Sequence, residues 1–182
     1  MIKTAVILAF AICAAPASAD PLAGMQAMGA DVIFLRHALA PGTGDPPGFR
    51  LGDCATQRNL SDEGRAQARA IGEALRNAGL PVSQILTSQW CRARDTAALL
   101  SLGPVTEEPG LNSFFGDPDQ RQAILDRLST RLADLPEGSA TGLTVMVTHQ
   151  VVITAVTGRT VPSGGAVLFD VDTGQAEPLR LP

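Results

Sequence analysis

Two short apolar runs that each end at a histidine constrain this chain more than any other feature of its sequence. The first covers residues 32–35 and leads into Arg36 and His37, and the second covers residues 143–148 and leads into His149. Short apolar runs with polar or Pro/Gly-rich boundaries are typical of buried strands. Ligands of open α/β sheets bind outside the carboxyl ends of the strands. Because the chain has two histidines in all, we expect one anion-binding pocket to be built around this pair.

The N-terminal residues have the pattern of a targeting segment. A positive start at Lys3 precedes an apolar run over residues 5–15, which is short for a membrane span, and residues 17–19 supply the small residues of a cleavage site. A lipoprotein signal at Cys13 is the alternative, although the residues before this cysteine fit that pattern poorly. We therefore expect residues 1–19 to be a cleaved signal peptide.

The remaining residues, 20–182, are numerous enough for one domain with its own hydrophobic core. Lys3 is the only lysine, so this segment carries 13 arginines against 18 acidic residues, a formal net charge of −5. Binding to nucleic acid or to an anionic membrane needs a basic excess, and no further apolar run is long enough to span a bilayer. We expect a periplasmic or secreted protein with no nucleic-acid partner and no stable membrane insertion after cleavage.

The two cysteines of the exported domain, Cys54 and Cys91, allow two interpretations. In an oxidising compartment an isolated pair most simply forms a disulfide, and its closure of a loop of about 37 residues stabilises the fold. The alternative is a metal site shared with the two histidines, although neither cysteine has the C-x-x-C spacing of such sites. We favour the disulfide.

The pattern along the chain predicts strands that alternate with helices. Residues 20–30 are small and flexible in composition, and the Pro/Gly-rich residues 38–53 form a loop. Ser61 is the expected N-cap of a helix that ends at Gly79. Strands are expected near residues 31–36, 84–88, 105–106, 143–148, 166–171 and 178–181, with further helices near residues 91–102, 118–135 and 150–157. This alternation predicts an α/β fold, a three-layer sandwich with a mostly parallel central sheet flanked by helices.

Several polar residues lie where they can join the two histidines at the sheet edge. Arg92 lies in the first turn of the helix that follows the second strand, where arginine and exposed helix N–H groups together bind anions. Arg94, two residues further on, is interpreted as an ordinary solvated side chain. Arg58 and Asn59 precede the helix capped by Ser61, which can carry them to the same edge.

These motifs resemble, in their order and spacing, those of the histidine phosphatase superfamily, whose members are similar to phosphoglycerate mutase. They are Leu35-Arg36-His37, the Leu60-Ser61-x-x-Gly64-x-x-Gln67-Ala68 helix start, Ser88-x-x-x-Arg92-Ala93-x-x-Thr96-Ala97 and Val147-Thr148-His149. The resemblance covers nearly all of the chain after residue 19. It implies a phosphoglycerate mutase-like fold and a metal-free phosphoryl transfer through a phosphohistidine.

The resemblance also implies a role for each matching position. Neutral His37 attacks phosphorus and becomes phosphorylated. Arg36 and Arg92 bind the phosphoryl oxygens, and His149 adds a donor as the imidazolium. Two weaker matches are expected to contact the substrate, Arg58 and Asn59. No metal or other cofactor is implied, because the arginines supply the positive charge. A disulfide between the two cysteines would tie the first loop to the helix that carries Arg92.

The chain departs from the family pattern at Ala38 and at the general acid. Ala38 stands where glycine is common, although small phosphohistidine phosphatases tolerate alanine there. Mutase-like members carry a glutamate where this chain has Ser113, and acid-phosphatase-like members carry an aspartate where it has Gln150. Several replacements stay open: Glu107, Glu108, Asp117 and an acid from residues 38–53. A substrate whose leaving group needs little protonation, such as phosphohistidine or an anhydride, is a further alternative.

The sequence thus predicts an exported phosphatase that hydrolyses a phosphomonoester, either a small molecule or a glycan phosphate. The chain has little room for a cap domain, so we expect an open pocket that accepts bulky substrates such as phosphorylated envelope sugars. The alternatives are a phosphohistidine phosphatase and a catalytically degenerate, phosphate-binding family member. Mutase activity is disfavoured because export separates the protein from glycolytic substrates.

Overall fold

The computed structural model describes residues 21–135 and 142–180 of the chain. The predicted signal peptide, residues 1–19, and the end of the last predicted strand at Leu181 lie outside these ranges. The strands are β1 (Val32–Arg36), β2 (Val82–Thr87), β3 (Val105–Glu107), β4 (Leu143–Thr148), β5 (Ala166–Phe169) and β6 (Ala176–Leu179). The helices are α1 (Pro21–Met28), α2 (Asp62–Asn77), α3 (Cys91–Leu100), α4 (Arg121–Ala133) and α5 (Gln150–Thr157), with 3-10 turns η1 (Cys54–Thr56), η2 (Pro109–Leu111) and η3 (Pro118–Gln120).

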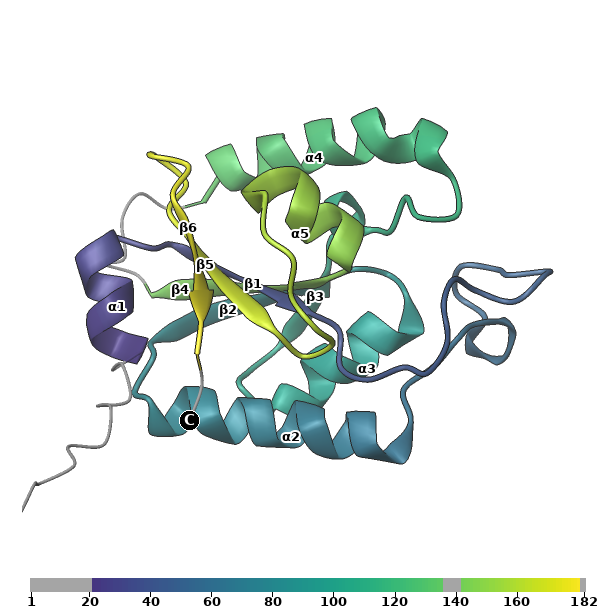
Figure 1. Ribbon diagram of the computed structural model, residues 1–182, viewed down its shortest axis with the longest axis horizontal. Helices are drawn as coiled ribbons and strands as arrows, with labels where there is room; N and C mark the ends of the chain where they lie inside the picture. The colour runs from purple at the N-terminus through teal and green to yellow at the C-terminus, as the bar shows by residue number, and fades with distance from the viewer. Residues whose placement is uncertain (1–20, 136–141, 181–182) are drawn as a thin grey trace, which may run out of the picture.

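The strands form one sheet in the order β3-β2-β4-β1-β5-β6. The first four run parallel to one another, and β5 and β6 add an antiparallel edge. Helices cover both faces of the sheet, with α4 and α5 on one face and α2 and α3 on the other (Figure 1). The predicted α/β sandwich with a mostly parallel central sheet is therefore confirmed. No described helix is long and apolar enough to cross a membrane.

The core lies on both faces of the sheet because side chains alternate along each strand. In β1, Ile33 and Leu35 pack with apolar residues of α2 and α3, whereas Val32 and Phe34 pack with those of α4 and α5. All six residues of β4 are buried. A central parallel strand that is covered on both faces reads as a continuous apolar run, which is why the sequence revealed β1 and β4 so clearly.

Two segments differ from the elements predicted from the sequence. Residues 20–30 were expected to be a flexible lead-in, but Pro21–Met28 form α1 and bury Met25 in the core. The helix expected over residues 118–135 begins as the 3-10 turn η3 and continues as α4. Apart from Gly24, and with Pro21 at the first helical position where proline is tolerated, α1 consists of good helix formers, and burial of Met25 against the sheet stabilises this short helix.

The start of α2 supports the backbone that follows β1. Ser61 accepts a hydrogen bond from the Gly64 N–H at 3.1 Å, so it is the predicted N-cap. A Cβ on Gly64 would lie 2.0 Å from the carbonyl oxygen of Leu39, so no side chain fits there. Gln67 accepts from the Leu39 N–H at 2.9 Å and donates to the Ser163 carbonyl at 2.8 Å. The motif at this helix start therefore positions a loop rather than a ligand.

Gly72 marks the closest approach of α2 to α3, because a Cβ there would lie 2.1 Å from the carbonyl oxygen of Leu100. We predict that Gly72→Ala lowers the free energy of unfolding by about 1–3 kcal/mol through overpacking, even though alanine has the higher helix propensity. Urea denaturation measures this change. The exposed neighbour Glu73 is the control, since Glu73→Ala is expected to change stability by less than about 0.5 kcal/mol. A Gly72→Ala variant as stable as the parent protein would contradict this packing.

Candidate active site

The two histidines meet because β1 and β4 are parallel neighbours in the sheet. Their register pairs Arg36 with Thr148, so His37 and His149 leave the two strands side by side. The His37 N–H donates to the Thr148 carbonyl at 3.0 Å, which continues the ladder past the end of β1. The centroids of the two imidazole rings lie 5.4 Å apart. The structure thus places both histidines at the carboxyl edge of the sheet.

The imidazole of His37 is held in one tautomer. Its Nδ1 lies 2.8 Å from the carbonyl oxygen of Ala38, a group that can only accept a hydrogen bond. Nδ1 therefore carries the proton, and Nε2 keeps its lone pair. The Ala38 N–H in turn donates to Oγ1 of Thr96 at 3.0 Å, which fixes the peptide that orients the ring. A neutral imidazole with an oriented lone pair is a nucleophile.

His149 is held by a hydroxyl that the sequence analysis did not assign to the site. Ser88, which follows β2, places its Oγ 2.8 Å from His149 Nε2 and donates its own proton to Oδ1 of Asn112 at 3.2 Å. With the hydroxyl proton committed to Asn112, His149 Nε2 is the donor to Ser88. Ser88 was visible only as the first residue of the motif that contains Arg92.

Burial keeps both imidazoles neutral. Desolvation lowers the pKa of His37 to about 3, and the charges of three neighbouring arginines contribute in the same direction. Desolvation, His37 and the same arginines hold the pKa of His149 well below its usual value. The neutral His37 agrees with the sequence prediction. His149 is neutral in this environment as well, because its burial among cations disfavours a further positive charge, and the imidazolium expected during phosphoryl transfer stays a prediction.

Arg36 and Arg92 present buried N–H groups that have no acceptor. Among the described residues, the Nε atoms of both side chains are buried without a hydrogen-bond partner. Arg36 is fixed through Nη1, which donates to the Val161 carbonyl at 2.9 Å, and the Arg92 side chain is only 4% exposed. Leaving a buried charged donor unsatisfied is costly. These two guanidiniums therefore form a site that is suited to an anion.

Arg58 lies with these arginines, whereas Asn59 does not. Arg58 lines the same cavity and donates to the backbone carbonyls of Gly44, at 2.7 Å, and of Ala40. Burial lowers the pKa of Arg58, and the Arg92 charge adds to this. The Asn59 amide instead donates to the carbonyl of Cys54 at 2.7 Å and lies outside the lining of the cavity. The predicted contact of Asn59 with substrate is therefore replaced by a role in supporting η1.

Asp45, from the Pro/Gly-rich loop, places a carboxylate among the arginines. It accepts hydrogen bonds from Arg92 Nη1 at 2.7 Å, Arg92 Nη2 at 3.2 Å, Trp90 Nε1 at 3.0 Å and the Arg58 N–H at 3.1 Å. Burial acts to raise the pKa of Asp45, but the hydrogen bonds from Arg92 and Arg58 outweigh it and hold the pKa below the usual value. The sequence suggested an acid from this loop without showing which one.

The site residues line one cavity of about 890 Å³. One wall comes from the loop that carries Asp45, where Phe49 stacks on Trp90 with ring centroids 5.2 Å apart. The lining also includes Ile124 of α4 and Phe115, which is 56% exposed. This volume is typical of pockets for complete small-molecule ligands. The pocket therefore has room for an organic group beside an anion.

The structure places no acid at the two positions where the resembling proteins carry one. Ser113 lines the cavity, and its hydroxyl accepts from the Phe115 N–H at 3.2 Å. Gln150 also lines the cavity, but its side chain accepts from the Val161 N–H at 3.0 Å and donates to Thr154 at 2.7 Å. Both side chains are committed to local structure.

The other candidates for the general acid differ in whether they line the cavity. Glu107 forms an exposed ion pair with Arg94 at 3.2 Å, and Glu108 accepts from the Gly110 N–H at the start of η2. Neither glutamate lines the cavity. Among the described residues, the carboxylates that do line it belong to Asp45 and Asp117. One of these two is therefore the candidate proton donor.

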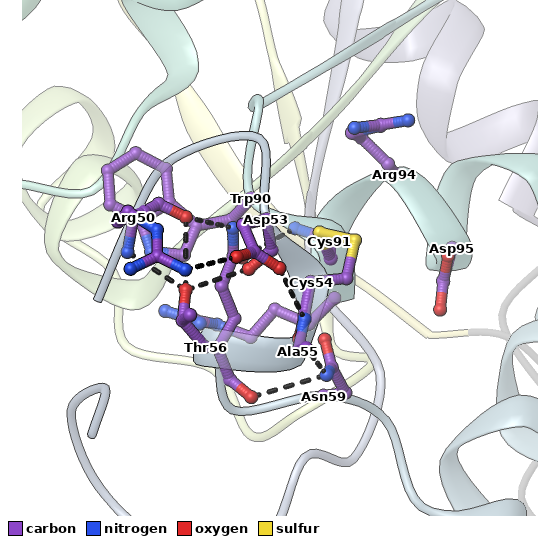
Figure 2. The surroundings of a disulfide bond; sticks show 12 residues. Arg50, Asp53, Cys54, Ala55, Thr56, Asn59, Trp90, Cys91, Arg94 and Asp95 are labelled. Atoms are coloured by element: carbon purple, nitrogen blue, oxygen red, sulfur yellow. Dashed lines mark hydrogen bonds and ion pairs between the residues drawn. A yellow bond between two sulfur atoms is a disulfide. The ribbon is translucent and has the colours of Figure 1, made fainter. Parts of the chain in front are cut away.

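Cys54 and Cys91 form the predicted disulfide (Figure 2). The bond joins the start of η1 to the first residue of α3, directly before Arg92. Figure 2 also shows Asn59 turned toward η1, and Arg94 on a part of α3 away from the hydrogen-bonded residues around Arg50. The bond therefore ties the first loop to the helix that carries Arg92. It also uses both thiolates that the alternative metal site required.

Comparison with known families identifies one match. Residues 32–121 match the family model of the histidine phosphatase superfamily, branch 1. The matched segment begins at β1 and ends at the start of α4, and it contains His37, Arg58 and Arg92. A search of curated proteins finds no significant match.

Solved structures share the fold at low sequence identity. Phosphoglycerate mutase from Plasmodium falciparum is 18% identical with a TM-score of 0.52, over 82% of this chain and 88% of its own. TTHB049 from Thermus thermophilus is 25% identical with a TM-score of 0.54, over 83% and 99%. A mycobacterial glucosyl-3-phosphoglycerate phosphatase, solved with VO3, is 18% identical with a TM-score of 0.55, over 82% and 97%. These similarities establish a phosphoglycerate mutase-like fold.

Loss of the disulfide is predicted to destabilise the protein strongly. The bond closes a loop with a sequence separation of 37, for which chain entropy gives a contribution of about 4 kcal/mol. We expect the Cys54→Ser/Cys91→Ser double variant to lose about this free energy of unfolding in urea denaturation under oxidising conditions. The parent protein measured with a reductant should show the same loss. A loss below about 1 kcal/mol would show that the bond does not brace the native loop.

Both imidazoles are predicted to stay neutral in mildly acidic solution. Since the pKa of His37 lies near 3, its ring should take up no proton between pH 8 and pH 5, and the His149 ring, whose pKa lies well below 6.5, should be neutral at pH 6.5 and above. A ¹⁵N NMR titration of the two rings measures this directly. The same protein unfolded in urea provides the control, because its histidines should titrate near 6.5. A midpoint near 6.5 in the folded protein would contradict the proposed burial of the site.

Proposed function

The chain is a phosphoglycerate mutase-like member of the histidine phosphatase superfamily, and on that premise we propose that it is a phosphatase that hydrolyses phosphomonoesters through a phosphohistidine on His37. The observation that carries the proposal is the hydrogen bond from His37 Nδ1 to the Ala38 carbonyl. It leaves the Nε2 lone pair free in a cavity that is also lined by Arg36, Arg58 and Arg92.

His37 is suited to attack phosphorus because burial keeps it neutral at physiological pH. In the proposed first step, Nε2 forms a bond to phosphorus while the bond from phosphorus to the leaving oxygen breaks. Water then attacks the phosphohistidine and releases phosphate. The proton stays on Nδ1 and is donated in a hydrogen bond to the Ala38 carbonyl throughout, so the ring keeps its orientation in both steps.

The arginines stabilise the charge of the transferred phosphoryl group. Negative charge in such a transition state spreads over the three equatorial oxygens, and preorganised cations bind it without reorganisation. Arg36 and Arg92 have free, buried Nε donors for these oxygens, and Arg58 lies beside them. In this proposal the arginines supply the charge stabilisation that a divalent metal supplies in other phosphoryl-transfer enzymes.

His149 is proposed to change its protonation state when a substrate binds. Its pKa is low because the ring is desolvated and surrounded by positive charge. A phosphoryl dianion held by the same arginines opposes that field and favours the imidazolium. The ring can then donate from one nitrogen to the phosphoryl group while Ser88 accepts from Nε2 at 2.8 Å.

An exported location and an envelope sugar phosphate as substrate extend the proposal. The Cys54–Cys91 disulfide supports an oxidising compartment, in line with the signal peptide expected from the sequence. The cavity of about 890 Å³ has room for a sugar-sized leaving group. Aromatic rings such as Phe49 and Trp90 suit the apolar face of a sugar ring.

A phosphate-binding protein without turnover is the second candidate. Two observations favour it, the polar but non-acidic side chains at Ser113 and Gln150 and the carboxylate of Asp45 on the phosphate-binding arginine. A phosphohistidine phosphatase is related to the main proposal, since its leaving group departs without strong acid assistance.

Phosphate release by purified protein tests the proposal. We expect turnover of a panel of aryl and sugar phosphates, and we expect His37→Ala to remove it because the variant lacks the proposed phosphoryl acceptor. Mass spectrometry of the acid-labile phosphoenzyme should locate the modification on His37. Absence of turnover in the parent protein, with the same background in His37→Ala, would leave only the binding function.

A matched pair of arginines on α3 provides the internal control. Arg92→Ala should lower kcat/KM by about 10²- to 10³-fold, the effect of removing one preorganised donor to a transition state. Arg94→Ala removes an exposed arginine two residues away that pairs with Glu107, and it should leave kcat/KM unchanged. Equal losses in the two variants would mean that Arg92 acts through stability alone.

A further inference from the structure

The leaving group needs a proton, and the structure points to one residue as its source. We infer that Asp45 is the general acid that protonates the leaving oxygen and the general base that later activates water. The inference rests on the proposed phosphatase function. It assigns the acid to a loop after β1, whereas the resembling proteins place theirs at the positions occupied here by Ser113 and Gln150.

The contacts of Asp45 place its carboxylate next to the reacting groups. It forms hydrogen bonds with two nitrogens of Arg92 and with Nε1 of Trp90. The Trp90 ring lies 5.4 Å from the His149 ring, which in turn lies 5.4 Å from the His37 ring. Asp117, the other described carboxylate of the cavity, makes none of these contacts.

Substrate binding changes the surroundings of Asp45 in the direction that an acid requires. Arg92 and Arg58 bind Asp45 directly, and the other charged and titratable groups that line the cavity with it are Arg36, His37, Asp117, Arg127 and His149. A phosphoryl dianion competes with the carboxylate for the Arg92 guanidinium. When Arg92 turns to the phosphoryl oxygens, the carboxylate loses two hydrogen bonds and faces new negative charge, and both changes favour its protonated form.

The loop around Asp45 allows a local shift of the carboxylate while its ends stay fixed. At one end, the Ala38 N–H is bound to Thr96, and at the other Cys54 is bonded to α3. Before the aspartate, Gly42 and Gly44 have φ values of 93° and 70°, and after it Gly48 has a φ of 82°. Glycine adopts this left-handed region without steric cost, so small backbone rotations there are accessible. The carboxylate can therefore leave Arg92 and stay inside the cavity.

The protons balance over the two steps. In the first, the His37 Nε2 lone pair bonds to phosphorus, the bond to the leaving oxygen breaks, and the carboxyl proton of Asp45 moves to that oxygen. In the second, the Asp45 carboxylate takes a proton from water as the water oxygen bonds to phosphorus and the bond to Nε2 breaks. The alcohol and phosphate leave, and both side chains return to their starting protonation states.

The dependence of the rate on the leaving group tests this role. p-Nitrophenolate leaves as a stable anion, whereas the alkoxide of benzyl alcohol requires protonation. Because kcat/KM covers only the steps up to departure of the leaving group, it isolates the acid role of Asp45 from its role as a base. We expect Asp45→Asn to lower kcat/KM on benzyl phosphate by about 10²-fold or more, the usual contribution of a general acid, and to lower kcat/KM on p-nitrophenyl phosphate by less than about threefold. Asp45→Glu, which keeps an acid, should recover part of the benzyl phosphate activity.

Two further aspartates serve as comparisons. Asp53 lies in the same loop, pairs with the exposed Arg50 at 2.6 Å and lies outside the cavity lining, so Asp53→Asn should leave both rates unchanged. Asp117→Asn tests the rival acid. The inference is overturned if Asp45→Asn lowers both rates by the same factor, if it raises them, or if Asp117→Asn shows the leaving-group dependence instead. An inactive parent protein would contradict the proposed function, which is a separate result.

Discussion

The parallel pairing of β1 with β4 is the interaction on which the candidate site depends. It sets Arg36 against Thr148, and the ladder continues through the hydrogen bond from the His37 N–H to the Thr148 carbonyl. Both strands are buried on both faces, so a slip of one residue would exchange the side chains of the two core layers and separate the histidines. The hydrophobic packing that stabilises the sheet therefore also sets the geometry of the chemistry.

A second constraint is the cost of keeping positive charge inside the protein. Arg92 is nearly fully buried, and a buried cation without a partner destabilises a fold strongly. Asp45 compensates that charge through a bidentate ion pair. The guanidinium proposed to bind phosphate is thus held by an internal anion, which a substrate phosphate would have to replace in the proposed mechanism. The same exchange would favour protonation of the aspartate.

Several motif residues act on the backbone rather than on a ligand. Thr96 binds the N–H of Ala38, whose carbonyl orients His37, and Gln67 binds the N–H of Leu39. Gly64 lets α2 approach the Leu39 carbonyl. Short motifs separated by tens of residues therefore share one task, which is to hold the three residues after β1. Their spacing follows from the packing of α2 and α3 on that loop.

The apolar runs, the helix cap at Ser61 and the motif spacing were sufficient to predict the α/β sandwich and the pair of histidines, because these features depend on local pattern and on strand order. The Cys54–Cys91 disulfide was predicted from the number of cysteines and the expected compartment. The contacts of Asp45 and Ser88 in the site and the neutral state of His149 could not be predicted in the same way. In a sequence, a functional aspartate, serine or histidine cannot be distinguished from any other residue of its type. Packing decides which hydrogen-bond partners the side chain meets and how far it is desolvated. Asn59 shows the converse, since it sits beside Arg58 in the chain but turns toward η1 in space. Adjacency in sequence sets which residues are neighbours along the backbone, whereas burial and charge, which set the chemistry, arise only when distant segments fold together.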